Sequence, residues 1–95
     1  MTTADEARLL LAKVRINRRA GNLYVFDDRI EIVTDTGNRI IPMHELERLT
    51  TRRSWRGAKL LLALTDGEII DVRRLAASHA SRAHRTIIAI ARGEQ

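Results

Sequence analysis

Turn signals recur at short, regular intervals along this chain of 95 residues, and this spacing constrains its fold more than any other feature. The clearest signal is Asp66-Gly67, because an Asp-Gly pair readily adopts the positive φ angles of a two-residue hairpin turn. Short runs separated by such turns are typical of an antiparallel sheet in which consecutive strands are neighbours. The other signals are Asp27-Asp28, Thr36-Gly37 and Trp55-Arg56-Gly57.

The runs between these turns are rich in Ile, Val, Leu, Thr and aromatic residues, as β-strands are. In the run 29–34, Ile30 and Ile32 share one face, which predicts a strand with one side buried. The run 58–65 is apolar on both faces and therefore predicts a strand near the centre of the fold. We expect strands at Asn22–Phe26, Arg29–Thr34, Asn38–Pro42, Leu49–Ser54, Ala58–Thr65 and Glu68–Arg73.

The beginning of the chain fits two patterns. Ala4–Val14 has the pattern of an amphipathic helix, and Arg8–Ile16 has that of a strand. We favour the strand, because Val14 and Ile16 are β-branched and 20–22 (Ala-Gly-Asn) then supplies a turn into the next strand. The face expected to point inward carries Leu10, Ala12, Val14 and Ile16.

Two further features shape the rest of the chain. Pro42 lacks a backbone donor, so it should end its strand or lie at a sheet edge, and 44–47 should form a brief helical turn. After the last predicted strand, the apolar residues recur with the period of an α-helix. Residues from about 76 to 92 therefore predict an amphipathic helix that stops at Gly93. Its apolar face carries Ala76, Ala77, Ala80, Ala83, Ile87, Ile88, Ile90 and Ala91.

The sequence therefore predicts one mainly β domain over residues 1–95, with residues 1–7 flexible and the strands within 8–73. We expect about seven short antiparallel strands that form a bent sheet or a partly open barrel, closed by the C-terminal helix. No apolar run approaches the roughly 20 residues of a membrane-spanning helix. Acidic residues near the N-terminus are unlike the positive charge of a signal peptide, so we expect a cytoplasmic protein.

This order of elements resembles bacterial pleckstrin-homology-like (PH-like) domains. The residues that carry the resemblance are Gly21-Asn22-Leu23-Tyr24-Val25-Phe26, Asp28-Arg29-Ile30-Glu31-Ile32, Gly37, Ile41-Pro42-Met43 and Leu46, and it covers roughly residues 8–92. The resemblance implies a binding scaffold for lipids, peptides or other copies of itself, and none of these residues is catalytic.

A second resemblance is to LytTR-type DNA-binding domains. It lies in 40–46 (Ile-Ile-Pro-Met-His-Glu-Leu), in 64–68 (Leu-Thr-Asp-Gly-Glu) and in Val72-Arg73. In that family a strand segment containing His and Arg follows the helix, and it has no counterpart in these 95 residues. The resemblance implies nucleic-acid binding as the alternative function.

The chain carries 17 Lys and Arg against 12 Asp and Glu, a formal net charge of +5. The cations fall in three segments, namely a turn near 13–19, a hairpin tip at 52–59, and the last strand with the helix, and the sequence leaves open whether they converge. Arginines around the tryptophan at the hairpin tip suit a protein interface, an anionic membrane or a base. The alternatives are a solvated turn and a tryptophan that folds back over the barrel end. The predicted binding residues are Arg18, Arg19, Arg52, Arg53, Trp55 and Arg56.

The sequence contains no pattern typical of an enzyme. It has no cysteine, and its three histidines (His44, His79 and His84) are too scattered to predict a metal site. His84 lies on the apolar face of the helix, where we expect a hydrogen-bonded structural role. We therefore expect no catalytic residue, no cofactor and no metal. The predicted function is a non-enzymatic binding or assembly module whose partner is a protein or another copy of the chain, the latter through an exposed strand edge. An anionic lipid surface and a nucleic acid are the alternatives.

Overall fold

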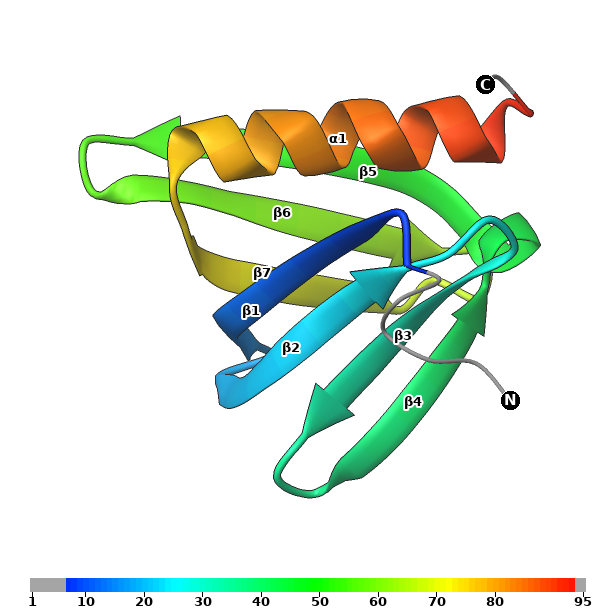
Figure 1. The fold of residues 1–95 in the computed structure, drawn as a ribbon, viewed down its shortest axis with the longest axis horizontal. Coiled ribbons are helices and arrows are strands. Elements are labelled where there is room, and N and C mark those ends of the chain that lie inside the picture. The colour runs from blue at the N-terminus through cyan, green and yellow to red at the C-terminus, as the bar shows by residue number, and fades with distance from the viewer. Residues whose placement is uncertain (1–6, 94–95) are drawn as a thin grey trace.

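The computed structural model describes residues 7–93, which form seven antiparallel strands and one α-helix in the expected order (Figure 1). The segment 1–7 that we expect to be flexible lies outside the described residues, apart from Ala7. The elements are β1 (Leu9–Ile16), β2 (Arg19–Val25), β3 (Arg29–Thr34), β4 (Gly37–Pro42), the 3₁₀ turn η2 (Met43–Glu45), β5 (Leu46–Ser54), β6 (Gly57–Leu64), β7 (Ile69–Leu75) and α1 (Ala77–Ala91).

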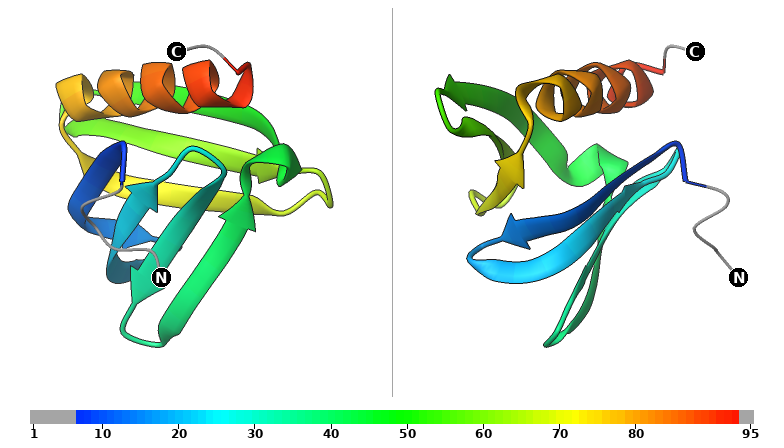
Figure 2. Two further views of the ribbon diagram at one scale, coloured as in Figure 1. Left: turned by 45° about the vertical axis from the view of Figure 1, so that its right-hand side comes forward. Right: turned by 60° about the vertical axis from the view of Figure 1, so that its left-hand side comes forward.

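The strands form a single sheet in the order β4-β3-β2-β1-β7-β6-β5. The sheet bends so that its two halves lie at an angle, and α1 covers the open side (Figure 2). β4 and β5 are the two edges, and η2 joins them along the chain. β4 ends at Pro42, so both predictions for this proline are confirmed. The predicted bent sheet closed by a C-terminal helix is also confirmed.

The core lies between the concave side of the sheet and α1. Leu23, Ile30 and Leu60 are fully buried, and no polar or charged residue among those described is buried. α1 packs mainly on β5 and β6, and its residues Ala80 and Ala83 are fully buried. Because alanines leave little side chain between the helix and the sheet, α1 packs closely on the strands, as its small-residue face predicts.

The inward face of β1 differs from our prediction. Leu9 and Leu11 are buried, whereas Leu10 is 47% exposed. The reason is a β-bulge, because the pairing with β2 shifts between Leu11 and Val14 and Lys13 adopts a φ of 55°. One extra residue in a strand moves every earlier side chain to the other face. The predicted strand is thus confirmed over the helix, but its alternation is wrong before the bulge.

The turn between β1 and β2 also lies elsewhere than predicted. It is formed by Asn17 and Arg18, whose φ angles are 50° and 73°, while 20–22 lies inside β2. Gly21 has a different role from a turn glycine. A Cβ there would lie 2.4 Å from the carbonyl oxygen of Val33, so only glycine allows β3 to approach this closely.

The hairpins after β3 and β5 have two-residue connections, and the second of them is Trp55-Arg56. The Asp66-Gly67 hairpin is confirmed, but its connection covers four residues, 65–68, instead of two. Asp66 Oδ1 accepts a hydrogen bond from the backbone N–H of Glu68 at 2.9 Å, which stabilises the longer turn. β7 continues to Leu75, two residues beyond the predicted end.

Candidate functional site

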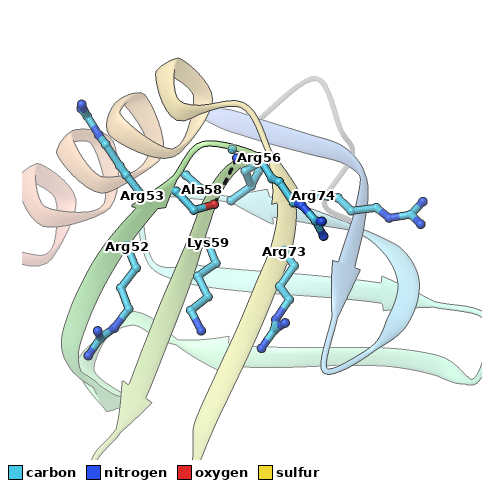
Figure 3. Close-up of a pocket in the computed structure, with 10 residues that line it drawn as sticks. Arg52, Arg53, Arg56, Ala58, Lys59, Arg73 and Arg74 are labelled. Atoms are coloured by element: carbon cyan, nitrogen blue, oxygen red, sulfur yellow. Dashed lines mark hydrogen bonds between the residues drawn. The ribbon is translucent and has the colours of Figure 1, made fainter.

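Six cationic residues line an open groove of about 630 Å³ at one end of β5, β6 and β7 (Figure 3). The remaining lining residues are small or apolar, and none carries a carboxylate. The groove therefore presents positive charge from three adjacent strands and the hairpin between two of them. The six cations are Arg52, Arg53, Arg56, Lys59, Arg73 and Arg74.

Arg52 and Lys59 form a directly opposed cross-strand pair between β5 and β6. Figure 3 shows their side chains and that of Arg73 projecting side by side from one face of the sheet. Like charges that lie directly opposite each other in a sheet destabilise it. This row is thus unfavourable for folding, and an anion bound to it would remove the repulsion.

A second β-bulge determines where Arg73 and Arg74 project. Ala58 pairs with Leu75 and Leu60 pairs with Val72, so Lys59 alone lies opposite both arginines. Arg74 adopts a φ of 66°, in the left-handed region that costs an ordinary residue about 1–2 kcal/mol. A bulge redirects a side chain that would otherwise alternate to the opposite face. Two consecutive arginines therefore line the same groove.

Only one carboxylate among residues 7–93 forms an ion pair with a groove cation. Arg73 Nε donates a hydrogen bond of 2.9 Å to Asp71 Oδ2. Arg53 lies on the opposite face of β5 from Arg52, and its Nη2 donates to Ser81 Oγ on α1 at 3.0 Å. Within the described part of the chain, the five groove cations other than Arg73 form no ion pair.

The groove brings together six of the 17 Lys and Arg of the chain, and none of its lining residues carries a carboxylate. The sequence leaves convergence open, and the fold brings the hairpin tip together with the end of β7. Lys59, Arg73 and Arg74 line the groove, but our predicted site omits them. They could not be predicted from local sequence, because the β6–β7 register brings them together.

Trp55 lies at the tip of the hairpin beside the groove and is 88% exposed. The guanidinium of Arg56 stacks on its ring, with Cζ 4.7 Å from the ring centroid. The alternative in which this tryptophan folds back over the barrel end is therefore wrong. A large exposed aromatic ring held by a cation–π contact is available to a partner.

Two of the predicted site residues lie apart from the groove. Arg18 and Arg19 belong to the β1–β2 hairpin, and neither lines the groove. Arg19 Nη1 lies 3.8 Å from Asp35 Oδ1, while the backbone carbonyl of Arg18 accepts a hydrogen bond from Arg15. The predicted site thus comprises two separate surfaces. On the one around 52–56, the three arginines line the groove and Trp55 lies beside it.

The histidines lie outside the groove, and so do Arg39 and Glu68, whose pKa values are shifted. His84 Nδ1 lies 2.8 Å from Thr51 Oγ1 on β5, which is the hydrogen-bonded role that we predict for it. Hydrogen bonds from Arg39 lower the pKa of Glu68, and the same contact raises the pKa of Arg39. No group of three or more metal-ligating side chains occurs within residues 7–93. Over the same residues, no helix is both long and apolar enough to cross a membrane.

Comparison with solved structures identifies the fold. The PH domain of USP37 matches with a TM-score of 0.73 and 15% sequence identity, over 90% of this chain and 96% of that domain. The fold is pleckstrin-homology-like. A second PH-like match is in the structure of the Spt16D Pob3N heterodimer, with a TM-score of 0.74 and 8% identity over 92% of this chain and 51% of that chain. This chain therefore spans about half of the second chain's length. No protein-family profile and no curated protein matches the sequence.

Proposed function

We propose that this chain is a non-enzymatic PH-like binding or assembly module that binds an acidic segment of a partner protein in its basic groove. The observation that carries the proposal is a groove lined by cations and by no carboxylate, in which Arg52, Lys59 and Arg73 project side by side from one face of the sheet. Five of the six are arginines, whose planar guanidinium groups donate two parallel hydrogen bonds to a carboxylate.

The energetics of the groove support a ligand role over a folding role. The Arg52–Lys59 pair places like charges opposite each other, and Arg74 occupies a strained backbone conformation. Both features lower the stability of the free domain. Unfavourable arrangements of this kind are typical of functional sites, where an oppositely charged partner offsets their cost.

The fold supports a protein partner. One of the structural neighbours is part of a heterodimer, so a PH-like unit occurs there within a protein assembly. The resemblance to bacterial PH-like domains likewise implies a scaffold for binding. Self-association through a strand edge stays a prediction, as does a cytoplasmic location.

Nucleic-acid binding is the second candidate, and the exposed ring of Trp55 favours it. A base stacked on this ring with phosphates in the groove would combine the two contacts that single-strand binders use. The resemblance to LytTR-type domains points the same way. The two candidates differ in their dependence on Trp55 and in their preferred probe.

The test measures binding of labelled hexaglutamate, a single-stranded oligonucleotide and anionic liposomes to the full chain. We expect hexaglutamate to bind, with log K falling as salt rises. The variant Arg52→Glu/Arg73→Glu should weaken this binding by more than about tenfold, because it reverses two charges in the groove. The control Arg48→Glu/Arg85→Glu makes the same change in net charge at exposed positions outside the groove and should have less than about a threefold effect.

Equal losses in the two double variants would contradict the proposal, because net charge alone would then explain binding. Tighter binding of the oligonucleotide that is lost in Trp55→Ala would replace it with the nucleic-acid candidate. Binding to anionic liposomes but not to hexaglutamate would replace it with a membrane-binding function.

A further inference from the structure

We infer that the acidic ligand is an extended chain that lies across the strands and reaches Arg15 on β1, beyond the groove itself. This inference rests on the proposed function of the groove and adds a direction, a length and one further binding residue. It follows from the register of four adjacent strands.

The strand pairing places four cations in one row. Arg52 lies opposite Lys59, and Lys59 lies opposite the bulge that contains Arg73. Arg73 in turn pairs directly with Arg15 of β1. The row therefore crosses β5, β6, β7 and β1 without interruption, although Arg15 does not line the groove.

Burial of the neighbouring residues places the whole row on the outer face. Val14 and Ile16 are buried, so Arg15 between them projects outward. Leu60 and Val72 are also buried, and the cations beside them project to the same outer side. Directly paired residues of antiparallel strands share one face, so the four side chains face one ligand. Arg73 Nε is bonded to Asp71 and Arg15 Nη1 to the carbonyl oxygen of Arg18, so these two guanidinium groups contact the ligand through their other N–H groups.

The length of the row sets the length of the ligand. Four adjacent strands are separated by three spacings of roughly 4.8 Å, so the row spans about 14 Å. An extended peptide advances about 3.3 Å per residue, so four to five residues cover this distance. The carboxylate of Asp71, two residues from Arg73 on the same face, repels acidic groups and bounds the ligand on that side.

The shape of the surface favours a flexible peptide. The sheet bends where β1 meets β7, and these two strands pair at only two positions (Figure 2). A rigid duplex cannot follow such a bend, whereas an extended peptide can. The next outward-facing pair beside the row is Thr50 and Leu61, so this part of the surface offers no aromatic ring on which bases could stack.

The test measures affinities of peptides with three, six and twelve glutamates for the full chain. Six glutamates should bind at least about tenfold tighter than three, and twelve should add less than about threefold. The variant Arg15→Glu should weaken the six-residue peptide by about five- to tenfold and leave the three-residue peptide within about twofold. The matched control Arg85→Glu changes the same charge at an exposed position on α1, away from the row, and should weaken both peptides by less than about twofold.

An equal effect of Arg15→Glu and Arg85→Glu would overturn the inference, as would an affinity that does not rise from three to six glutamates. These results are distinguishable from failure of the groove, because Arg52→Glu/Arg73→Glu would still weaken binding of every peptide by more than about tenfold. If a single-stranded oligonucleotide binds more tightly than six glutamates and depends on Arg15, the occupant of the row is a nucleic acid and the peptide inference is wrong.

Discussion

Arg52 and Lys59 lie directly opposite each other on β5 and β6, so the sheet holds two cations in one cross-strand pair. Neither side chain forms an ion pair within the described residues. An arrangement that disfavours folding supports the anionic partner that we propose. This relationship gives the first prediction.

The variant Arg52→Glu should stabilise the free domain while it weakens ligand binding. It replaces a repulsive pair with an attractive Glu–Lys pair, which should raise the free energy of unfolding by about 0.5–1 kcal/mol. Urea unfolding at low salt measures this change. The control Arg48→Glu lies opposite Ala63 on the same strands and should change stability by less than about 0.5 kcal/mol. A destabilised Arg52→Glu variant would mean that Arg52 has a structural role.

The bulge gives a second prediction, from two substitutions at one position. Arg74→Gly and Arg74→Ala both remove the guanidinium, but only glycine adopts a φ of 66° without steric cost. The glycine variant should therefore be more stable than the alanine variant by about 1 kcal/mol in thermal or urea unfolding. Both variants should bind hexaglutamate equally weakly. Equal stabilities would show that the backbone at this position is not strained.

Much of the fold follows from local sequence, because turns and alternation are local properties. Asp66-Gly67 predicts its hairpin, and Ile30 with Ile32 predicts the buried face of β3. The two bulges could not be predicted in this way. Lys13 and Arg74 carry positive φ angles that their residue types do not favour, so tertiary pairing imposes them.

The candidate site was only partly predictable for the same reason. Arg52, Arg53 and Arg56 are neighbours in the sequence around Trp55, so they form a visible cluster. Arg73 and Arg74 join them only through the β6–β7 register and its bulge. Arg18 and Arg19 are also consecutive arginines, but they lie in the β1–β2 hairpin, away from the groove. No local sequence pattern indicates this difference.

Arg39 and Glu68 give a prediction on pH. The contact joins edge strand β4 to the β6–β7 turn, with Arg39 Nη1 donating to Glu68 Oε2 at 2.5 Å and Nη2 donating to Oε1. Hydrogen bonds from Arg39 lower the pKa of Glu68 below its ordinary 4.5 in the folded protein. Its stabilising contribution is therefore complete above the unfolded pKa and is lost as pH falls through the folded pKa.

The free energy of unfolding of the wild type should accordingly exceed that of Glu68→Gln near pH 6, by up to about 1 kcal/mol. The difference should shrink as pH is lowered from about 5 to about 3. Urea unfolding across this range measures it. A difference that stays constant with pH would contradict the assignment to the Glu68 carboxylate.

Trp55 gives a prediction that separates folding from recognition. Since its side chain is 88% exposed, Trp55→Ala should change the free energy of unfolding by less than about 0.5 kcal/mol. Binding of hexaglutamate should fall by less than about threefold, because the cations make the principal contacts. Thermal unfolding and a peptide titration measure the two effects. A loss of more than about tenfold would identify the indole ring as a main contact.

The binding surface can be located by an amide chemical-shift map of the full chain titrated with hexaglutamate. If the acidic ligand lies in the groove, the largest shifts should cluster at 52–59 and 72–75, with a further shift at Arg15, and all of them should diminish as salt is added. Shifts centred instead on the surface between β5 and α1 around His84, or spread evenly over every exposed arginine, would contradict it.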